Sequence, residues 1–234
     1  RHNIMREERK VTVNGESHTV VISDEREALL AASAAGRASV AVWDGKNGEF
    51  LPAAFAVESP EDADEEFLQR VVRRKLGLPW EICRTERLII REFAESDADS
   101  IPPGETGGPG DGIFQDREKL RAYIGQQYGF CQYGIWAVTD KESGRLVGMA
   151  GFGPPAEDMD GLELGYHIFA PWRRRGYGLE SCRAVLEWER RELGLPVWAR
   201  IHRDNTPSLR LAGRLGFQVF REEKEILYLI QNKK

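Results

Sequence analysis

The first eighty residues alternate short apolar runs with amphipathic stretches, a pattern typical of a small α/β domain. This pattern predicts strands over 20–23, 39–43 and 53–57, helices over 24–35 and 61–76, and a turn over 44–48. Asp24 is expected to cap the first helix, with Glu27 three residues later completing a capping box. The order predicts a small, parallel α/β domain over residues 1–83, whose role the pattern does not indicate.

A different pattern begins near Thr85, where longer alternating strands are separated by helices. The predicted elements are strands over 87–93, 134–139, 146–152, 162–169, 197–202, 218–221 and 225–230, and helices over 95–101, 116–128, 176–192 and 206–215. Residues 102–112 are rich in glycine and proline, which predicts a loop without regular structure. This mixed order predicts an α/β (α+β) fold with a mixed, mostly antiparallel central sheet over residues 84–234.

Composition and charge argue against several classes of protein. The 234 residues are 41% apolar and 30% charged, as in a soluble globular protein. No stretch approaches the ~18 consecutive apolar residues of a membrane span. The net charge of −5 lacks the basic excess of a nucleic-acid binder. Three separated cysteines without metal-ligand spacing, and a charged start without an apolar stretch, lead us to expect a cytoplasmic protein with reduced thiols and no metal.

The segment 170–180 carries the strongest chemical signal. Three consecutive arginines, ending at Arg175, precede Gly176 and Gly178 at the start of a predicted helix. The glycines allow a close approach to a ligand, and helix N-terminal N–H groups favour an anion. The spacing matches neither a P-loop nor the G-x-G-x-x-G dinucleotide motif. The residues therefore predict a phosphate site of unspecified ligand, with a solvated basic turn as the alternative.

These residues resemble a known motif. The run Arg173-Arg174-Arg175-Gly176-Tyr177-Gly178 is similar to the Arg/Gln-x-x-Gly-x-Gly/Ala motif with which the GNAT superfamily of N-acetyltransferases holds the pyrophosphate of acetyl-CoA. Other blocks similar to that superfamily are Glu163-Leu164-Gly165-Tyr166, Pro171-Trp172, Asp204-Asn205-Thr206-Pro207-Ser208 and Arg214-Leu215-Gly216-Phe217. Thr85-Glu86-Arg87-Leu88-Ile89-Ile90-Arg91 resembles the first strand of the ribosomal-protein alanine acetyltransferase-like branch. Residues 85–228 are thus identified as a GNAT domain, and residues 1–83 lie outside the match.

The resemblance implies a GNAT fold in which two central strands splay apart and acetyl-CoA lies in the opening as a co-substrate, without a metal. The main chain of 163–169 would pair with the pantetheine arm, and N–H groups of 174–178 would take the pyrophosphate. Asn205 would orient the pantetheine arm; capping of the following helix is its alternative role. The residues expected to bind acetyl-CoA are Ile168, Phe169, Arg173, Arg174, Arg175, Gly176, Tyr177, Gly178, Asn205 and Ser208.

Acetylation of an amine requires the amine to be neutral. At pH 7, loss of the proton costs roughly 4–5 kcal/mol for a lysine-like amine and about 1–1.5 kcal/mol for a peptide α-amine. Glu163 is the candidate general base, and His167, on the same face of the strand, is a candidate to pass the proton through water. Ordinary solvated or hydrogen-bonded strand residues are the alternative. The tyrosine that serves many family members as the acid is replaced here by Ala212, which leaves Ser208 or water for that role.

Together these features predict an N-acetyltransferase that transfers acetyl from acetyl-CoA to a primary amine by direct attack on the thioester. The acceptor is a protein N-terminus or a small-molecule amine, and a homodimer is left open. A regulatory module that binds acyl-CoA without turnover is the alternative. The loop over 102–112 falls where the family places its substrate-side helices, so we expect it to act as a lid over the acceptor; a disordered surface insertion is its alternative.

Overall fold

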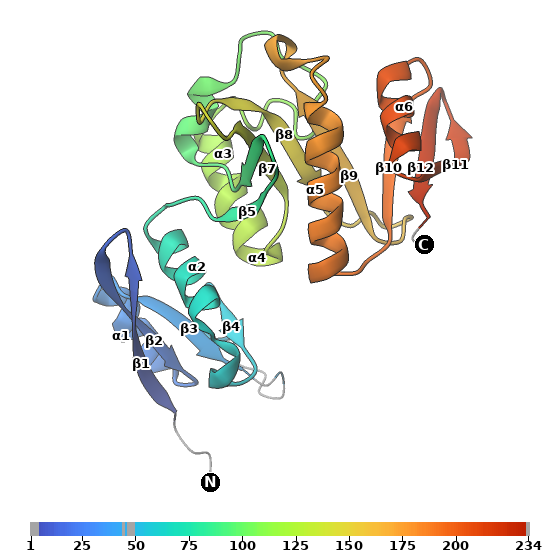
Figure 1. The fold of residues 1–234 in the computed structure, drawn as a ribbon. Coiled ribbons are helices and arrows are strands. Elements are labelled where there is room, and N and C mark those ends of the chain that lie inside the picture. Colours follow the sequence, from blue (N-terminus) through green and yellow to red (C-terminus); the bar gives the residue numbers. More distant parts are fainter. Residues whose placement is uncertain (1–4, 44, 46–49, 233–234) are drawn as a thin grey trace. The chain divides into compact units, whose positions relative to one another are not determined.

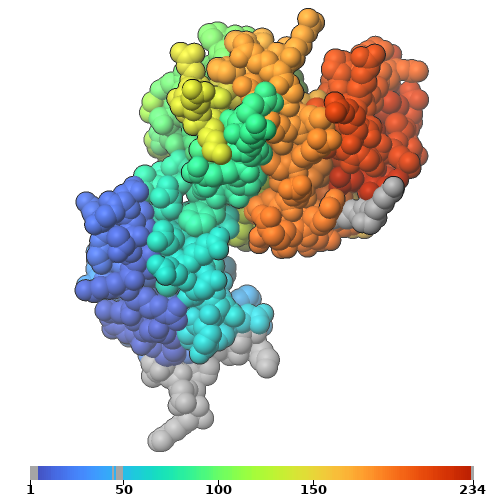
Figure 2. Space-filling model, viewed as in Figure 1, coloured from blue at the N-terminus to red at the C-terminus, as the bar shows by residue number. Residues whose placement is uncertain are grey.

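The chain folds into two compact units, residues 1–80 and 81–234, in a computed structural model (Figures 1 and 2). The structure describes residues 5–43, 45 and 50–232. Each unit has its own buried apolar core, so the two are described separately. The first unit ends at Trp80, close to the composition change at the predicted junction.

The first unit is a four-stranded sheet with two helices. Its elements are β1 (Arg6–Val13), β2 (Glu16–Ser23), α1 (Arg26–Ala34), β3 (Ala38–Val42), β4 (Ala56–Val57), a 3-10 turn η1 (Pro60–Asp62) and α2 (Glu65–Lys75). The strand order is β1-β2-β3-β4, in which β1 is antiparallel to β2 and the other pairs are parallel. Val20 and Ile22 share one core with Leu68 and Val72 of α2. Alternate strand residues therefore bury one face of the sheet under α2.

The β1–β2 hairpin is absent from the sequence prediction, which places a single strand at 20–23. Exposed and partly exposed charged residues occupy much of β1, so its apolar pattern is weak. The turn residues Asn14 and Gly15 both have positive φ, of 51° and 81°. An Asn-Gly pair with this geometry is a strong hairpin signal, and it makes the sheet mixed rather than parallel.

The helix starts in this unit also differ from the prediction. The expected capping role of Asp24 is wrong: the cap position is Glu25, without a side-chain cap bond, and the Asp24 carboxylate accepts a hydrogen bond from the Met5 N–H at 3.0 Å. The helix expected from residue 61 begins at Glu65, where Asp64 accepts from the Phe67 N–H at 2.8 Å. Asp24 bonds to the segment before β1 instead of capping α1. Helix α2 begins where Asp64 can accept a hydrogen bond from its first turn. Most of the turn predicted over 44–48 lies outside the described residues.

The second unit contains an eight-stranded sheet of order β11-β12-β10-β9-β8-β7-β6-β5. Its strands are β5 (Glu81–Arg84), β6 (Leu88–Arg91), β7 (Ile135–Asp140), β8 (Leu146–Phe152), β9 (Leu162–Ile168), β10 (Val197–His202), β11 (Phe217–Glu223) and β12 (Ile226–Gln231). Every neighbouring pair is antiparallel except β9 and β10, which are parallel. The predicted mixed, mostly antiparallel sheet is confirmed, with β5 as an additional edge strand.

Helices cover this sheet. They are η2 (Glu95–Ser100), α3 (Arg117–Tyr123) continuing through a π-turn η3 (Ile124–Tyr128) into α4 (Gly129–Cys131), η4 (Ala170–Trp172), α5 (Tyr177–Glu192) and α6 (Thr206–Arg214). The longest, α5, contacts β5, β8 and β9 (Figure 1). Its buried residues Val185 and Trp188 join the same core as Trp136 of β7. This packing fixes the start of α5 beside the end of β9.

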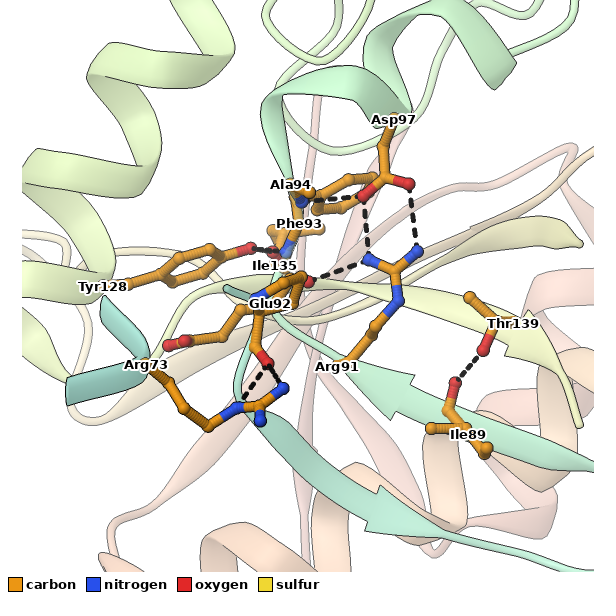
Figure 3. A network of polar contacts seen from close by, with 11 residues as sticks. Arg73, Ile89, Arg91, Glu92, Phe93, Ala94, Asp97, Tyr128, Ile135 and Thr139 are labelled. Atoms are coloured by element: carbon orange, nitrogen blue, oxygen red, sulfur yellow. Dashed lines mark hydrogen bonds and ion pairs between the residues drawn. The ribbon is translucent and has the colours of Figure 1, made fainter. Parts of the chain in front are cut away.

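A partly buried ion pair organises the segment after β6 (Figure 3). Arg91 donates two hydrogen bonds to Asp97, at 2.8 and 3.0 Å, and Asp97 also accepts from the Ala94 N–H at 2.7 Å. The Tyr128 hydroxyl donates to the Ile135 carbonyl and accepts from the Phe93 N–H. These bonds fix the chain before the loop over 102–112, which leads to α3 and packs against β9.

Candidate active site

The parallel strands β9 and β10 separate soon after they begin. They pair only at Leu162 with Val197 and at Glu163 with Trp198, so beyond these pairs they diverge (Figure 1). From Leu164 onward, β9 keeps β8 on one edge and has no strand partner on the other within the described sheet. A free strand edge offers N–H and C=O groups to an extended ligand. The splay expected from the resemblance is therefore present.

A cavity of about 370 Å³ lies in this splay. Its walls come from β9, β10, the start of α6 and the loop residues Gly107, Gly108 and Pro109. The expected site residues Glu163, Asn205 and Ser208 line it. This volume is within the range of small-molecule sites.

The bend before α5 has the geometry of an anion cradle. Arg174 and Gly176 adopt left-handed backbone conformations, with φ of 62° and 81°. Helix α5 makes its first backbone hydrogen bond from the Glu180 N–H to the Gly176 carbonyl at 3.1 Å. The N–H groups of residues 176–179 donate to no acceptor in the described part of the chain. Four free donors at a helix N-terminus suit a diphosphate.

The bend also lacks room for side chains. A Cβ on Gly178 would lie 3.2 Å from Leu211 Cδ1 and 3.3 Å from Tyr166 Cε2. The absence of a side chain here lets the start of α5 lie close to Leu211 of α6 and Tyr166 of β9. The donor set of the bend fits the diphosphate of coenzyme A.

The three arginines of the bend differ in their surroundings. Arg173 turns toward β9, where its Nε donates to the Ile168 carbonyl at 2.9 Å and a terminal nitrogen lies 3.3 Å from Glu105. Arg175 lies over the Trp172 ring at 5.2 Å. The Arg174 guanidinium has no protein partner among the described residues. Arg174 and Arg175 thus have more freedom than Arg173 to meet a phosphate.

The candidate base Glu163 is held in an ion pair. Arg200 of β10 donates to both carboxylate oxygens, at 2.8 and 3.2 Å. The Glu163 side chain is 23% exposed. These two bonds orient the Glu163 carboxylate toward β10.

The candidate relay residue His167 is paired too. Its Nε2 lies 2.7 Å from Glu105, which belongs to the loop over 102–112. The other oxygen of Glu105 accepts from the Ala170 N–H at 2.7 Å. Burial raises the pKa of Glu105, but the bonds from Ala170 and His167 outweigh burial and leave the pKa below its ordinary value. Glu105 therefore ties the loop to β9 and to the start of the bend.

The same face of β9 meets the loop at two further points. A Cβ on Gly165 would lie 3.0 Å from Pro109, and a Cβ on Gly108 would lie 3.0 Å from His167. The predicted alternation along β9 is thus confirmed, since Gly165 and His167 face the loop while Tyr166 faces Gly178 of α5. The loop therefore packs against the strand through specific contacts.

The opposite face of β9 carries a tyrosine beside the start of α6. The Tyr166 hydroxyl lies 2.8 Å from the Ser208 hydroxyl, and both line the cavity. Burial raises the pKa of Tyr166, with a smaller lowering by the Ser208 hydrogen bond. Ala212, at the position where many family members have a tyrosine, also lines the cavity. Asn205 caps α6 by accepting from the Ser208 N–H at 3.3 Å.

The expected residues fall into two groups. The structure gathers Glu163, Asn205 and Ser208 around the cavity and the bend next to it, while the side chains of Ile168 and Phe169 are buried in the core. Sequence reasoning missed Glu105, Tyr166 and Arg200, each of which pairs with a predicted residue. Charged and aromatic residues of this kind carry no local motif, although Tyr166 stood within a block similar to the family.

The cysteines lie away from the cavity, whose lining contains none of them. Cys83, Cys131 and Cys182 form no disulfide, and burial raises the pKa of Cys83 to about 12 and also raises that of Cys182. Within the described ranges, no cluster of His, Cys, Asp and Glu suits a metal ion, and no helix has the length and apolar character to cross a bilayer.

Comparison with known proteins agrees with this geometry. The model of the acetyltransferase (GNAT) domain matches residues 87–218. The uncharacterized N-acetyltransferase YoaA of Bacillus subtilis (strain 168) is 28% identical over 146 residues, which is 58% of this chain and 82% of YoaA. The uncharacterized N-acetyltransferase p20 of Bacillus licheniformis is 25% identical over 147 residues, 59% of this chain and 83% of p20.

Solved structures share the fold of the second unit. A protein from Bordetella pertussis assigned to the GnaT-family acetyltransferases has a TM-score of 0.56 and 25% identity, over 65% of this chain and 99% of that one. The ribosomal-protein-S5-alanine acetyltransferase of Vibrio fischeri has a TM-score of 0.52 and 16% identity, over 63% and 93%. With the splayed strands, the free donors of the bend and the matched domain, the chain belongs to the GNAT family of acetyltransferases, enzymes that use acetyl-CoA.

Proposed function

We propose that this enzyme transfers acetyl from acetyl-CoA to a primary amine by direct attack on the thioester. The observation that carries the proposal is the row of four free N–H groups over 176–179, beside a splay with a free strand edge. Those donors would hold the diphosphate, with Arg174 and Arg175 adding positive charge. Ile168 and Phe169, at the end of β9, would guide the pantetheine arm through their main chain, and Asn205 would orient that arm from the start of α6.

Bound acetyl-CoA supplies the thioester, and the protein's residues supply position and proton transfer. Ser208, whose hydroxyl lies 2.8 Å from that of Tyr166, would donate a hydrogen bond to the departing sulfur. Direct attack is supported because no cysteine lines the cavity to carry the acetyl group. The acceptor amine would approach from the side of β9 that carries Glu163 and His167.

The pairing of the candidate bases favours an acceptor that loses its proton easily. Glu163 is engaged by Arg200, and His167 by Glu105. A peptide α-amine, with a pKa of about 7.7–8.0, needs far less help than a lysine-like amine of about 10.4. A protein N-terminus, as in the ribosomal-protein alanine branch, therefore fits better than a lysine-like amine, and a small-molecule amine of low pKa fits equally well.

Release of free thiol from acetyl-CoA tests the proposal across a panel of peptides and small amines. We expect turnover with α-amine acceptors near pH 7, and turnover with lysine-like amines only as the pH rises. Glu163→Gln is expected to slow lysine-like acceptors more than α-amine acceptors, since only the former need a strong base. Coenzyme A binding without thiol release for any amine would instead support a module without turnover. Cytoplasmic location and a homodimer remain predictions, the latter testable by the mass in solution.

A further inference from the structure

Arg87 lies outside the cavity and outside the arginine-glycine motif of the bend. It nevertheless contacts residues just before and just after the point where α5 begins. Its Nε donates to Glu180 at 2.8 Å, and one terminal nitrogen donates to the Arg175 carbonyl at 2.9 Å. The guanidinium also lies 4.4 Å over the Tyr177 ring. Arg87, which immediately precedes β6, therefore contacts three residues around the start of α5: Arg175, Tyr177 and Glu180.

The bond to the Arg175 carbonyl sets the direction of a free donor. A trans peptide is planar, so the C=O of Arg175 and the N–H of Gly176 point in opposite directions. Because Arg87 holds the carbonyl, the Gly176 N–H points away from Arg87. Gly176 has a left-handed backbone, and Arg87 lies beside it, 3.4 Å from where its Cβ would be. Arg87 thus fixes the first of the four donors of the bend.

The ion pair with Arg87 neutralises the negative charge of Glu180, which would be unfavourable beside a bound phosphate. Glu180 lies in the first turn of α5, next to the donors that would hold a diphosphate. One oxygen accepts from Arg87 Nε, and the other accepts from the Thr85 hydroxyl at 2.6 Å and the Arg87 N–H at 3.1 Å. A carboxylate at this place would repel a phosphate if it were unpaired. Arg87 and Thr85 occupy both of its oxygens.

We propose that Arg87 is a positioning residue for the diphosphate of coenzyme A, acting through the Arg175 peptide and Glu180. It does not contact the ligand itself. This inference rests on the proposed function, because it assumes that the bend holds the diphosphate.

The experiment compares two donors, acetyl-CoA and S-acetylpantetheine, which lacks the diphosphate. For Arg87→Gln we expect the KM for acetyl-CoA to rise about tenfold, with kcat within about twofold and the KM for S-acetylpantetheine unchanged. Glu180→Gln in the same chain should recover part of the loss, because it removes the charge that Arg87 neutralises. Arg87→Lys should recover part as well, since one ammonium can pair with Glu180 without also holding the Arg175 carbonyl.

Matched controls separate positioning from folding. Arg84→Gln removes an exposed arginine that pairs with Glu81 at 2.7 Å, and we expect it to leave both KM values unchanged. Thr85→Val removes one bond to Glu180 while keeping Arg87, and it should raise the acetyl-CoA KM by less; it replaces Arg87→Gln if that variant does not fold.

The outcomes are distinct. Unchanged KM for acetyl-CoA in folded Arg87→Gln, or an equal rise for both donors, overturns the role of Arg87. If the unaltered enzyme uses both donors with the same KM, the diphosphate site of the proposed function fails instead.

Discussion

Two glycine-rich segments flank β9, and they use their glycines in opposite ways. The bend before α5 leaves the N–H groups of residues 176–179 without protein acceptors. In the loop over 102–112, two glycine N–H groups have side-chain acceptors: the Gly107 N–H donates to Asp111 and the Gly112 N–H donates to Gln115. Glu105 accepts further bonds from β9 and from the Ala170 N–H. Glycine content alone therefore does not predict a ligand cradle; a run of free donors at the N-terminus of a long helix does.

The two regions also differ in the substrate that each would meet, the coenzyme at the bend and the acceptor amine at the face of β9 toward the loop. The bend is ready to receive an anion, because nothing in the protein has to move from its donors. The face of β9 toward the loop is already paired, with Glu163 on Arg200 and His167 on Glu105. An acceptor there would compete with these existing polar contacts, so we expect this side to set selectivity and the bend to set affinity for the coenzyme.

The largest expected effect comes from closing the cradle. Gly176→Val places a β-branched residue at a φ of 81°, which costs about 2 kcal/mol and would pull the bend out of shape. We expect coenzyme A binding to weaken roughly thirtyfold, measured by titration calorimetry.

Gly213→Ala is the matched control, because Gly213 lies in α6 with open space around its Cα. It should leave binding unchanged. Full coenzyme A affinity in folded Gly176→Val would show that the bend is not the cradle.

A smaller effect is expected between the two regions, at the Tyr166–Ser208 pair. Tyr166→Phe removes one hydrogen bond of about 1 kcal/mol, which corresponds to roughly a fivefold loss in kcat. The KM for acetyl-CoA should stay near its original value. Tyr133→Phe, on the chain before β7, serves as the control, and an equal loss of kcat in both variants would remove the special role of Tyr166.

On the loop side the expected effect is on stability rather than on turnover. Glu105 has a pKa below its ordinary value, so its stabilising contribution is present above pH ~4.3 and is lost as the pH falls through the lowered value. Glu105→Gln should therefore reduce the free energy of unfolding at pH 7 by about 1 kcal/mol, and the difference from the original protein should shrink toward acid. Urea unfolding at several pH values measures it.

Glu118→Gln, at an exposed residue of α3, controls for the loss of a carboxylate. A constant difference at all pH values would contradict the assignment to Glu105. Limited proteolysis within 102–112 adds a test of the lid: protection that does not change with acceptor present would rule the lid out.

Local patterns account for most of the second unit. Alternation along residues 162–169 gives β9 its two faces, and the glycines and arginines of 173–178 give the bend, because both depend on neighbours a few residues apart. The same rules failed where a distant segment supplied the partner. Asp24 bonds to Met5 instead of capping a helix, and β1 pairs through a hairpin that its charged residues disguise.

The sequence by itself determined the order of most elements, the mostly antiparallel sheet and the position of the arginine-glycine bend before α5, because periodicity and backbone freedom depend on residues close together in the chain. Only the tertiary structure decided what surrounds the site. Arg200 pairs with Glu163 across 37 residues, Glu105 with His167 across 62, and Arg87 with Glu180 across 93. Such side-chain contacts depend on how strands and loops are brought together in space, and a polar side chain gives no local indication of the partner that it contacts.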